Sequence, residues 1–314
     1  MKSLGSSVVW VFELDVIYSP EVADAIADNR PIVALESTIS SMLGLPVPFN
    51  AEVVARCNAA IRHRGAVPAM TAILDGRAVI GVTDDQLHRV LQGTRKCAQR
   101  DVPIAMTQAW DVGVTTVSGT LALCVAAGIR VFATGGIGGV HRDDHLTGDV
   151  SADLRSIANS PVVTVTAGAK AFLDLPKTVE LLDSLSVPLL GMRTDYFPAF
   201  YSRSSGLAIH HRIDSAGQAA SIARAHWNLG GGGVVVANPI PVSAEIPNDE
   251  IDPVIEQALA QASRDHITGA ALTPYVLGVI ATATAGRSIP ANLALAENNA
   301  AVAAEIASAL LTAM

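Results

Sequence analysis

The chain has 314 residues, of which 50% are hydrophobic and only 16% are charged, and its mean hydropathy is +0.39. This composition excludes a disordered chain, which would have too few apolar residues to bury, and the length suits one large α/β domain or two smaller ones. A net charge of −8 and an aromatic content of 4% argue against a nucleic-acid-binding protein, which needs a cationic surface or rings on which bases stack.

Residues 1–18 are predicted to form an N-terminal arm and residues 19–314 a single α/β domain, because no low-complexity linker or repeat divides the chain. The apolar stretch at 7–20 contains Glu13 and Asp15, so we expect neither a signal peptide nor a membrane span. Three widely spaced cysteines without a C-x-x-C pair indicate buried thiols rather than a disulfide or a zinc site. We therefore expect a soluble, cytoplasmic protein that binds neither membrane nor nucleic acid.

The first predicted helix begins after Ser19 and ends near Asn29. Ser19 is a favourable N-cap, Pro20 suits the first turn, and Glu21 places a negative charge near the positive end of the helix. After this helix, β-rich segments alternate with alanine-rich amphipathic segments. The predicted strands are 32–37, 67–73, 78–81, 104–107, 131–133, 162–166, 188–191 and 233–237. The other predicted helices are 51–64, 84–92, 117–127, 153–158, 178–184, 216–229, 249–265 and 292–311.

Most of these strands lack a clean alternation of polar and apolar residues and are separated by helices, which indicates an α/β fold with a mostly parallel sheet covered by helices on both faces. Ligands of such sheets bind at the C-terminal ends of the strands. Polar and glycine clusters follow several predicted strands, namely Glu36-Ser37-Thr38, residues 134–141, Gly168-Ala169-Lys170 and Asn238-Pro239. The sequence therefore predicts a site at this edge of the sheet.

Lys170 is the first candidate for chemistry. Only four of the 21 basic residues are lysines, so arginine serves wherever a generic positive charge is needed. Lys170 directly follows a β-branched strand and small residues, and apolar neighbours would disfavour its ammonium form and lower its pKa. A neutral amine can form an imine with an open sugar. The alternative is a lysine that extends from the start of a helix toward solvent.

Glu36 is the second candidate, because it ends the apolar run 32–35 at a predicted strand end. Partial burial can raise the pKa of such a carboxyl toward the working pH, as a general acid or base requires. The alternative is a structural carboxylate paired with a buried arginine.

Residues 134–141 form a glycine-rich loop whose backbone N–H groups could approach an anion, although no P-loop or G-x-G-x-x-G motif is present. Lys96 could hold a phosphate or could lie in an exposed basic loop. The acidic residues at 143–153 could bind Mg²⁺ or Mn²⁺ through one or two carboxylates and water, but most acid-rich loops are only solvated. The 149–153 run could equally cap the next helix.

Together these segments resemble the pseudouridine-5′-phosphate glycosidase family. The resemblance covers residues 20–311, and its blocks occur in the same order as in the family. They are 33–39, 65–69, 100–103, 115–117, 131–142, 149–154, 167–174, 197–200, 203–205, 235–241 and 298–300.

The resemblance implies a homotrimeric α/β protein that acts on the C-glycosidic bond between ribose 5-phosphate and a base. It implies that Lys170 is the nucleophile that attacks C1 and forms an imine of the ring-opened sugar, with Glu36 as the proton donor. The implied substrate-binding residues are Lys96, Val117, Ser151, Ala152 and Asp153, together with His141 and Asn292 as further sugar-phosphate contacts. Asp149 is implied to hold Mn²⁺, or another divalent cation in its place, largely through waters.

The chain also departs from the family pattern. After Glu-Ser-Thr-Ile the family reaches His-Gly-x-Pro, whereas residues 40–46 are one residue longer and lack the histidine. Ala98 stands where the family has serine, and the loop before Asp149 contains Asp143-Asp144 and Thr147-Gly148 in place of the usual residues. A uracil ring needs hydrogen-bond partners, so these changes, with the inserted Met42-Leu43, predict a more apolar pocket for a larger aromatic acceptor.

We therefore expect a C-glycosynthase that joins ribose 5-phosphate to an aromatic, polyketide-type acceptor through a lysine imine. One alternative is a glycosidase that cleaves pseudouridine 5′-phosphate to uracil and ribose 5-phosphate, with a pyrimidine in place of the aromatic acceptor. Another is a non-catalytic sugar-phosphate sensor, which would leave Lys170 and Glu36 without a role.

Overall fold

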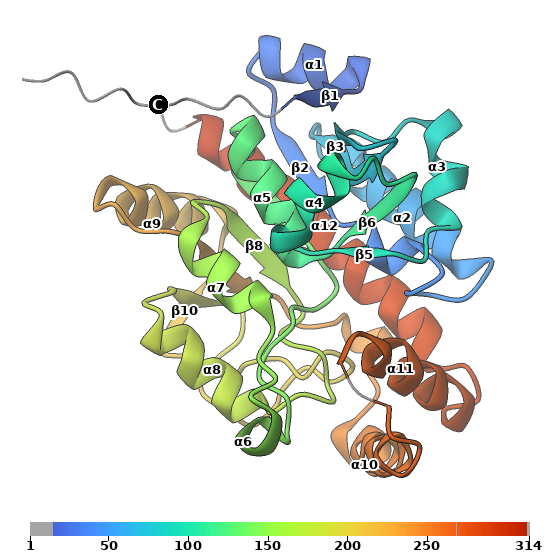
Figure 1. Cartoon of the computed structure of the whole chain (residues 1–314). Coiled ribbons are helices and arrows are strands. Elements are labelled where there is room, and N and C mark those ends of the chain that lie inside the picture. The colour runs from blue at the N-terminus through green and yellow to red at the C-terminus, as the bar shows by residue number, and fades with distance from the viewer. Residues whose placement is uncertain (1–14, 268, 313–314) are drawn as a thin grey trace, which may run out of the picture.

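A sheet of eleven strands runs through the centre of the described residues, which are 15–267 and 269–312 of the computed structural model (Figure 1). The strand order is β1-β4-β3-β2-β7-β8-β11-β9-β10, and β6 joins β3 to β5. The strands are β1 Val16–Tyr18, β2 Ile32–Leu35, β3 Val67–Leu74, β4 Arg77–Ile80, β5 Lys96–Cys97, β6 Val112–Thr115, β7 Val131–Ala133, β8 Val163–Thr166, β9 Leu189–Met192, β10 His211–Ile213 and β11 Val234–Ala237.

All strand pairs among these residues are parallel except β3 with β4 and β3 with β6. The central strands β8 and β11 are buried along their whole length, which explains why they read as apolar or β-branched runs without polar alternation. The predicted mostly parallel sheet is confirmed.

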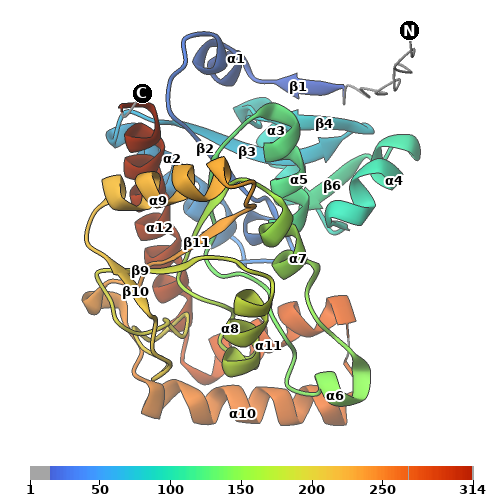
Figure 2. The same cartoon turned by 90° about the vertical axis from the view of Figure 1, so that its left-hand side faces the viewer.

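Helices cover both faces of this sheet. Figure 2 shows α12 on one side of the strands and α5 and α7 on the other. The helices are α1 Pro20–Ala27, α2 Phe49–His63, α3 Asp84–Leu91, α4 Val102–Thr107, α5 Val117–Ala127, α6 Asp144–Thr147, α7 Ala152–Asn159, α8 Leu175–Ser184, α9 Ala216–Asn228, α10 Asn248–Arg264, α11 Leu272–Ala283 and α12 Ser288–Thr312. No helix in residues 15–267 or 269–312 is long and apolar enough to cross a membrane.

The long helix α12 packs against β2, β7 and β8 and lies between α2 and α9. Its alanine-rich sequence allows this close approach, because small side chains let a helix lie near its neighbours. Fully buried Ala300, Ala303 and Ala304 belong to this surface. The helix therefore reaches the C-terminal ends of the three central strands.

Most of the predicted elements are confirmed, with small differences at their ends. The predicted strand 104–107 is wrong, because these residues belong to α4. Pro103 lies in the first turn of that helix, where its missing N–H costs no hydrogen bond. The elements β5, β6, β10, α6 and α11 were not predicted.

The predicted arm is partly a strand. Val16, Ile17 and Tyr18 form β1 and pair with Ala78, Val79 and Ile80 of β4. Residues 1–14, which make up the rest of the predicted arm, lie outside the described residues.

The register of β2, β7 and β8 aligns their C-terminal ends. Leu35 pairs with Ala133, and Ala133 pairs with Val165. The residues that follow these strands, Glu36 and Thr134 among them, are therefore brought to one edge of the sheet.

Candidate active site

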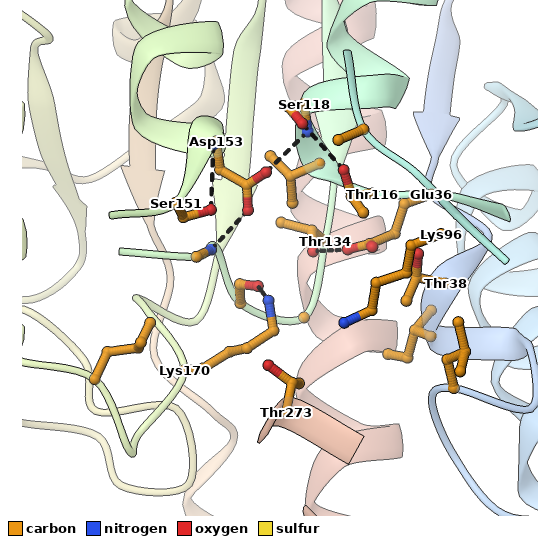
Figure 3. Close-up of a pocket in the computed structure, with 18 of the residues that line it drawn as sticks. Glu36, Thr38, Lys96, Thr116, Ser118, Thr134, Ser151, Asp153, Lys170 and Thr273 are labelled. Carbon is orange, nitrogen blue, oxygen red and sulfur yellow. Dashed lines mark hydrogen bonds between the residues drawn. The ribbon is translucent and has the colours of Figure 1, made fainter. Parts of the chain in front are cut away.

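A cavity of about 340 Å³ lies at this edge. All ten residues that the sequence predicts for the site line it, and Figure 3 shows several of them. They are Glu36, Lys96, Val117, His141, Asp149, Ser151, Ala152, Asp153, Lys170 and Asn292. The fold thus brings the ten residues together, while the chemical role of each stays a prediction.

Glu36 follows β2 and faces the residue that follows β7. The hydroxyl of Thr134 donates a hydrogen bond to Glu36 Oε1. Burial raises the pKa of the Glu36 carboxyl above its ordinary value, and the positive charge of Lys170 opposes this most strongly, followed by the Thr134 hydrogen bond. A carboxyl that keeps its proton to a higher pH is suited to donate it to a substrate.

Lys170 is placed by a tight turn after β8. Gly168 has φ +89°, and a Cβ there would lie 2.1 Å from the carbonyl oxygen of Pro198, so only glycine fits. The Lys170 N–H donates to the Ile137 carbonyl at 3.1 Å, and its Nζ donates to the Gly136 carbonyl, also at 3.1 Å. The lysine is therefore held to the glycine loop by both its backbone and its amine.

Lys96 provides a second amine from the other side of the cavity. It lies on β5, which pairs with β6, and Figure 3 shows its side chain and that of Lys170 pointing toward each other, with Thr273 below them. Burial lowers the pKa of Lys96, the charge of Lys170 lowers it further, and Glu36 and Asp153 oppose the shift. The cavity thus holds two amines near the carboxyls of Glu36 and Asp153, and either amine can attract an anionic group.

The Asp153 carboxylate accepts hydrogen bonds from the backbone of two neighbouring segments. Its Oδ1 accepts from the Ser118 N–H at 3.0 Å and its Oδ2 from the Gly138 N–H at 2.9 Å. It thereby joins the N-terminus of α5 to the glycine loop. The hydroxyl of Ser151 accepts from the Asp153 N–H, which confirms that this run caps the next helix.

His141 and Asp149 lie side by side at the cavity wall, with His141 Nε2 3.8 Å from Asp149 Oδ2. Burial lowers the pKa of the imidazole, while the Asp149 carboxylate raises it. Within residues 15–267 and 269–312, no group of three or more His, Cys, Asp or Glu side chains could hold a metal ion. A divalent cation at Asp149 would therefore take most of its ligands from water and substrate.

Asn292 of α12 has a buried side-chain oxygen, Oδ1, with no hydrogen-bond partner. The residue is 5% exposed and lines the cavity. Leaving such an acceptor unpaired costs about 1–3 kcal/mol, so a ligand hydroxyl or N–H that reached it would gain a favourable contact.

The apolar part of the lining differs from the expectation in one residue. Leu43 lines the cavity, as do Leu45 and Ala98. Met42 does not line it and is 51% exposed, because the turn after β2 directs this side chain outward. Of the inserted Met42-Leu43 pair, only Leu43 therefore contributes to the apolar pocket as expected.

The sequence reasoning missed several lining residues. Thr273 and Leu277 of α11 line the cavity, and so do Phe172 and Phe200. Buried Val276 and Ile280, four residues apart, are a helical signal that could have identified α11. Phe200 carried no such signal, because its place depends on Gly136, where a Cβ would lie 2.5 Å from the phenylalanine ring.

Comparisons with known proteins identify the relatives of this chain. The family described as "Indigoidine synthase A like protein" matches residues 21–309. The chain is 46% identical over 295 residues to a pseudouridine-5′-phosphate glycosidase of Geobacillus kaustophilus, which covers 93% of this chain and 97% of that protein. It is 48% identical over 295 residues to one of Sorangium cellulosum, which covers 93% of this chain and 92% of that protein.

Two solved structures have the same fold. One is the prealnumycin C-glycosynthase AlnA in complex with ribulose 5-phosphate, with a TM-score of 0.86, 36% identity and coverage of 96% of this chain and 98% of that chain. The other is an indigoidine synthase A-like protein of Thermotoga maritima, with a TM-score of 0.85, 33% identity and the same coverage. Among individual proteins, the sequence departures predict a likeness to the C-ribosylating enzyme of alnumycin biosynthesis, and this likeness is confirmed.

The substitution Glu36→Gln tests the environment of the carboxyl. Because burial raises the pKa of Glu36 above the ordinary value of 4.5, the folded protein retains this proton at a pH where the unfolded chain has lost it. The free energy of unfolding of the wild type should therefore fall, relative to that of Glu36→Gln, as the pH rises from 4.5 through the raised pKa. Denaturant titrations of both proteins across this range measure the difference. If the free energy of unfolding of the wild type instead rose with pH relative to that of Glu36→Gln, the lysines would hold the pKa of Glu36 below its ordinary value.

Proposed function

This chain belongs to the family of indigoidine synthase A-like proteins, and we propose that it is an enzyme that forms or breaks a C–C glycosidic bond at C1 of ribose 5-phosphate. The observation that carries this proposal is the meeting of Lys170 and Glu36 in one cavity, both in contact with the loop that follows β7. The names of the curated relatives and the ribulose 5-phosphate in the AlnA structure support the substrate class.

A C–C glycosidic bond resists cleavage because the base is a poor leaving group and its linking carbon has no lone pair to protonate. We propose that the neutral Lys170 amine attacks C1 and breaks the bond between C1 and the ring oxygen, and that this oxygen takes a proton from the attacking nitrogen. The nitrogen lone pair then forms the imine while the electrons of the C–C bond pass to the base carbon, which takes the proton of Glu36. Water finally releases ribose 5-phosphate from the imine.

Synthesis runs through the same imine. The amine condenses with the open aldehyde of ribose 5-phosphate and water is lost. An electron-rich ring carbon of the acceptor attacks C1 and gives up its proton to the Glu36 carboxylate, and ring closure by the sugar hydroxyl expels the lysine amine. Lys96 holds the sugar phosphate, and Asn292 accepts a hydrogen bond from the ligand.

We propose that the acceptor is an aromatic, polyketide-type ring and that the enzyme is a C-glycosynthase. Leu43, Leu45 and Leu277 line the cavity, and Ala98 stands where the family has a serine. Such side chains favour a ring with a large apolar surface over a pyrimidine, whose polar groups need partners.

Cleavage of pseudouridine 5′-phosphate is the second candidate. The two curated relatives that carry this name are 46% and 48% identical to the chain, whereas AlnA is 36% identical. Because the chemistry of Lys170 and Glu36 serves both directions, only the ring that the cavity accepts distinguishes the two candidates.

Three further parts of the proposal come from the family resemblance. Asp149 would hold Mn²⁺, or another divalent cation in its place, and such an ion would supply charge neutralisation beside an anionic substrate. His141 contacts the sugar phosphate. We also propose a homotrimer, and the cytoplasmic location stays a prediction.

Borohydride trapping with ribose 5-phosphate tests the imine. The wild type should gain a covalent adduct equal to the sugar phosphate less one oxygen atom, located on Lys170 by peptide mass spectrometry. Lys170→Ala should lose the adduct and lower turnover by more than about 10³-fold, because covalent catalysis is removed. Lys177→Ala, which removes an exposed lysine paired with Asp144, is the control and should behave as the wild type. Turnover by Lys170→Ala at the wild-type rate would exclude the mechanism, and a wild type without adduct would favour the sensor.

A paired assay identifies the ring. The enzyme should couple ribose 5-phosphate to a hydroxylated naphthalene or anthraquinone, as followed by chromatography and mass spectrometry, and should release uracil from pseudouridine 5′-phosphate only slowly. Ala98→Ser should raise uracil release by about 2- to 10-fold, because it adds one hydrogen bond worth about 0.5–1.5 kcal/mol. Rapid uracil release with inert aromatic acceptors would instead establish the glycosidase.

Asp149→Ala tests the metal. Its activity should fall and recover partly on addition of Mn²⁺, since the loss of one carboxylate weakens binding of the ion without removing its water and substrate ligands. Asp143→Ala, in the same loop but outside the cavity lining, is the matched control and should keep the wild-type Mn²⁺ dependence. The same dependence in Asp149→Ala would exclude Asp149 as a ligand.

A further inference from the structure

Asn299 of α12 and Asn238 after β11 form a buried pair to which the chemistry above gives no role. Asn299 is 0% exposed and Asn238 is 6% exposed. The Asn238 side-chain amide donates to Asn299 Oδ1 at 2.9 Å, and the Asn238 N–H donates to the Thr166 carbonyl at 2.8 Å. The pair therefore ties α12 to the ends of β8 and β11.

The other end of the Asn299 amide reaches the loop after β7. Its Nδ2 donates to the Thr134 carbonyl at 2.8 Å and to the Gly135 carbonyl at 3.4 Å. Both donor positions and the acceptor of this buried side chain are thus occupied, which fixes the orientation of the amide.

The 134–136 segment that Asn299 holds is in contact with both reactive groups. The Thr134 hydroxyl donates to Glu36, and the Gly136 carbonyl accepts from the Lys170 amine. Two glycines give this segment high backbone freedom. Backbone hydrogen bonds to Val165 and Ala167 hold it from the side of β8, and Asn299 holds it from the side of α12.

We propose that Asn299, braced by Asn238, is a positioning residue that fixes the 134–136 segment and thereby sets the placement of the Glu36 carboxyl relative to the Lys170 amine. The inference rests on the proposed function for the chemical roles of Glu36 and Lys170. Asn299 itself touches neither group, so it acts only through the segment that it holds.

The substitution Asn299→Asp replaces the donor that faces two carbonyls with a carboxylate oxygen. Repulsion should displace the segment and lower kcat by about 10- to 100-fold, since a displacement on the order of 1 Å costs that much, while the KM for ribose 5-phosphate changes by less than about 3-fold. Asn298→Asp is the matched control. Its side-chain amide also donates to a carbonyl, that of Pro239, but this carbonyl lies outside the 134–136 segment, so the kcat of Asn298→Asp should stay near that of the wild type.

A pH series separates positioning from general damage. When the new carboxyl of Asn299→Asp is protonated, its O–H can again donate to the Thr134 carbonyl, so the ratio of wild-type to variant kcat should shrink as the pH falls. Asn299→Leu has no donor at any pH, and its ratio should stay constant. A wild-type kcat in Asn299→Asp, or a ratio independent of pH, would overturn the inference. If Asn299→Asp does not fold, Asn238→Ala is the alternative variant, because it removes only the hydrogen bond from Asn238 to Asn299. Its kcat should be a few-fold lower than that of the wild type, and an unchanged kcat in Asn238→Ala would overturn the inference.

Two readouts keep this inference distinct from the proposed function. Borohydride trapping should be slower in Asn299→Asp than in the wild type; equal rates would reject the positioning role and keep the imine. If the wild type forms no adduct, the proposed function fails instead. A crystal structure of Asn299→Asp then decides the positioning role, because the Gly136 carbonyl should move away from Lys170 Nζ, and an unmoved carbonyl would reject it.

Discussion

The parallel pairing of β2, β7 and β8 is the constraint on which the rest of the site depends. Leu35, Ala133 and Val165 lie side by side in this register, so the segments that follow them leave the sheet at one edge. Glu36 follows the first strand and Lys170 the third, and the glycine loop lies between them. Hydrogen bonds from Thr134 to Glu36 and from Lys170 to Gly136 use this adjacency. A shift of one residue in the register would separate the acid from the amine.

Burial and neighbouring charges act on the pKa values of the ionisable groups in the cavity. Burial favours the neutral form of Glu36, while Lys170 and Lys96 favour its carboxylate. Burial also lowers the pKa of Lys96, and the nearby lysine adds to that effect. Burial thus favours the uncharged forms of Glu36 and Lys96, and an anionic phosphate entering the cavity would favour the protonated form of a nearby amine.

The apolar wall of the cavity comes from two separate parts of the chain. Leu43 and Leu45 lie in the segment after β2, where the sequence departs from its family. Thr273 and Leu277 lie on α11, which packs mainly against α10. Under the proposed function, the ring that the cavity accepts would depend on side chains outside the central sheet, whereas the sugar chemistry would depend on residues at the strand ends. Such a separation would allow Lys170 and Glu36 to serve different acceptors.

The sequence by itself determined the mostly parallel sheet and the position of Glu36 and Lys170 just after two of its strands, because apolar strands followed by polar or glycine residues are local patterns. The family resemblance supplied the other predicted site residues, and all ten line one cavity. From the sequence, residues 104–107 were misassigned as a strand, although they follow a proline in the first turn of a helix. Met42 was also counted toward the apolar pocket, although the course of the loop leaves this side chain exposed. Only the tertiary structure decided that Thr134 holds Glu36 and that Asn299 holds the glycine loop. Both contacts join segments far apart in the chain. The first depends on the pairing of β2 with β7, and the second on the packing of α12 against β7 and β8.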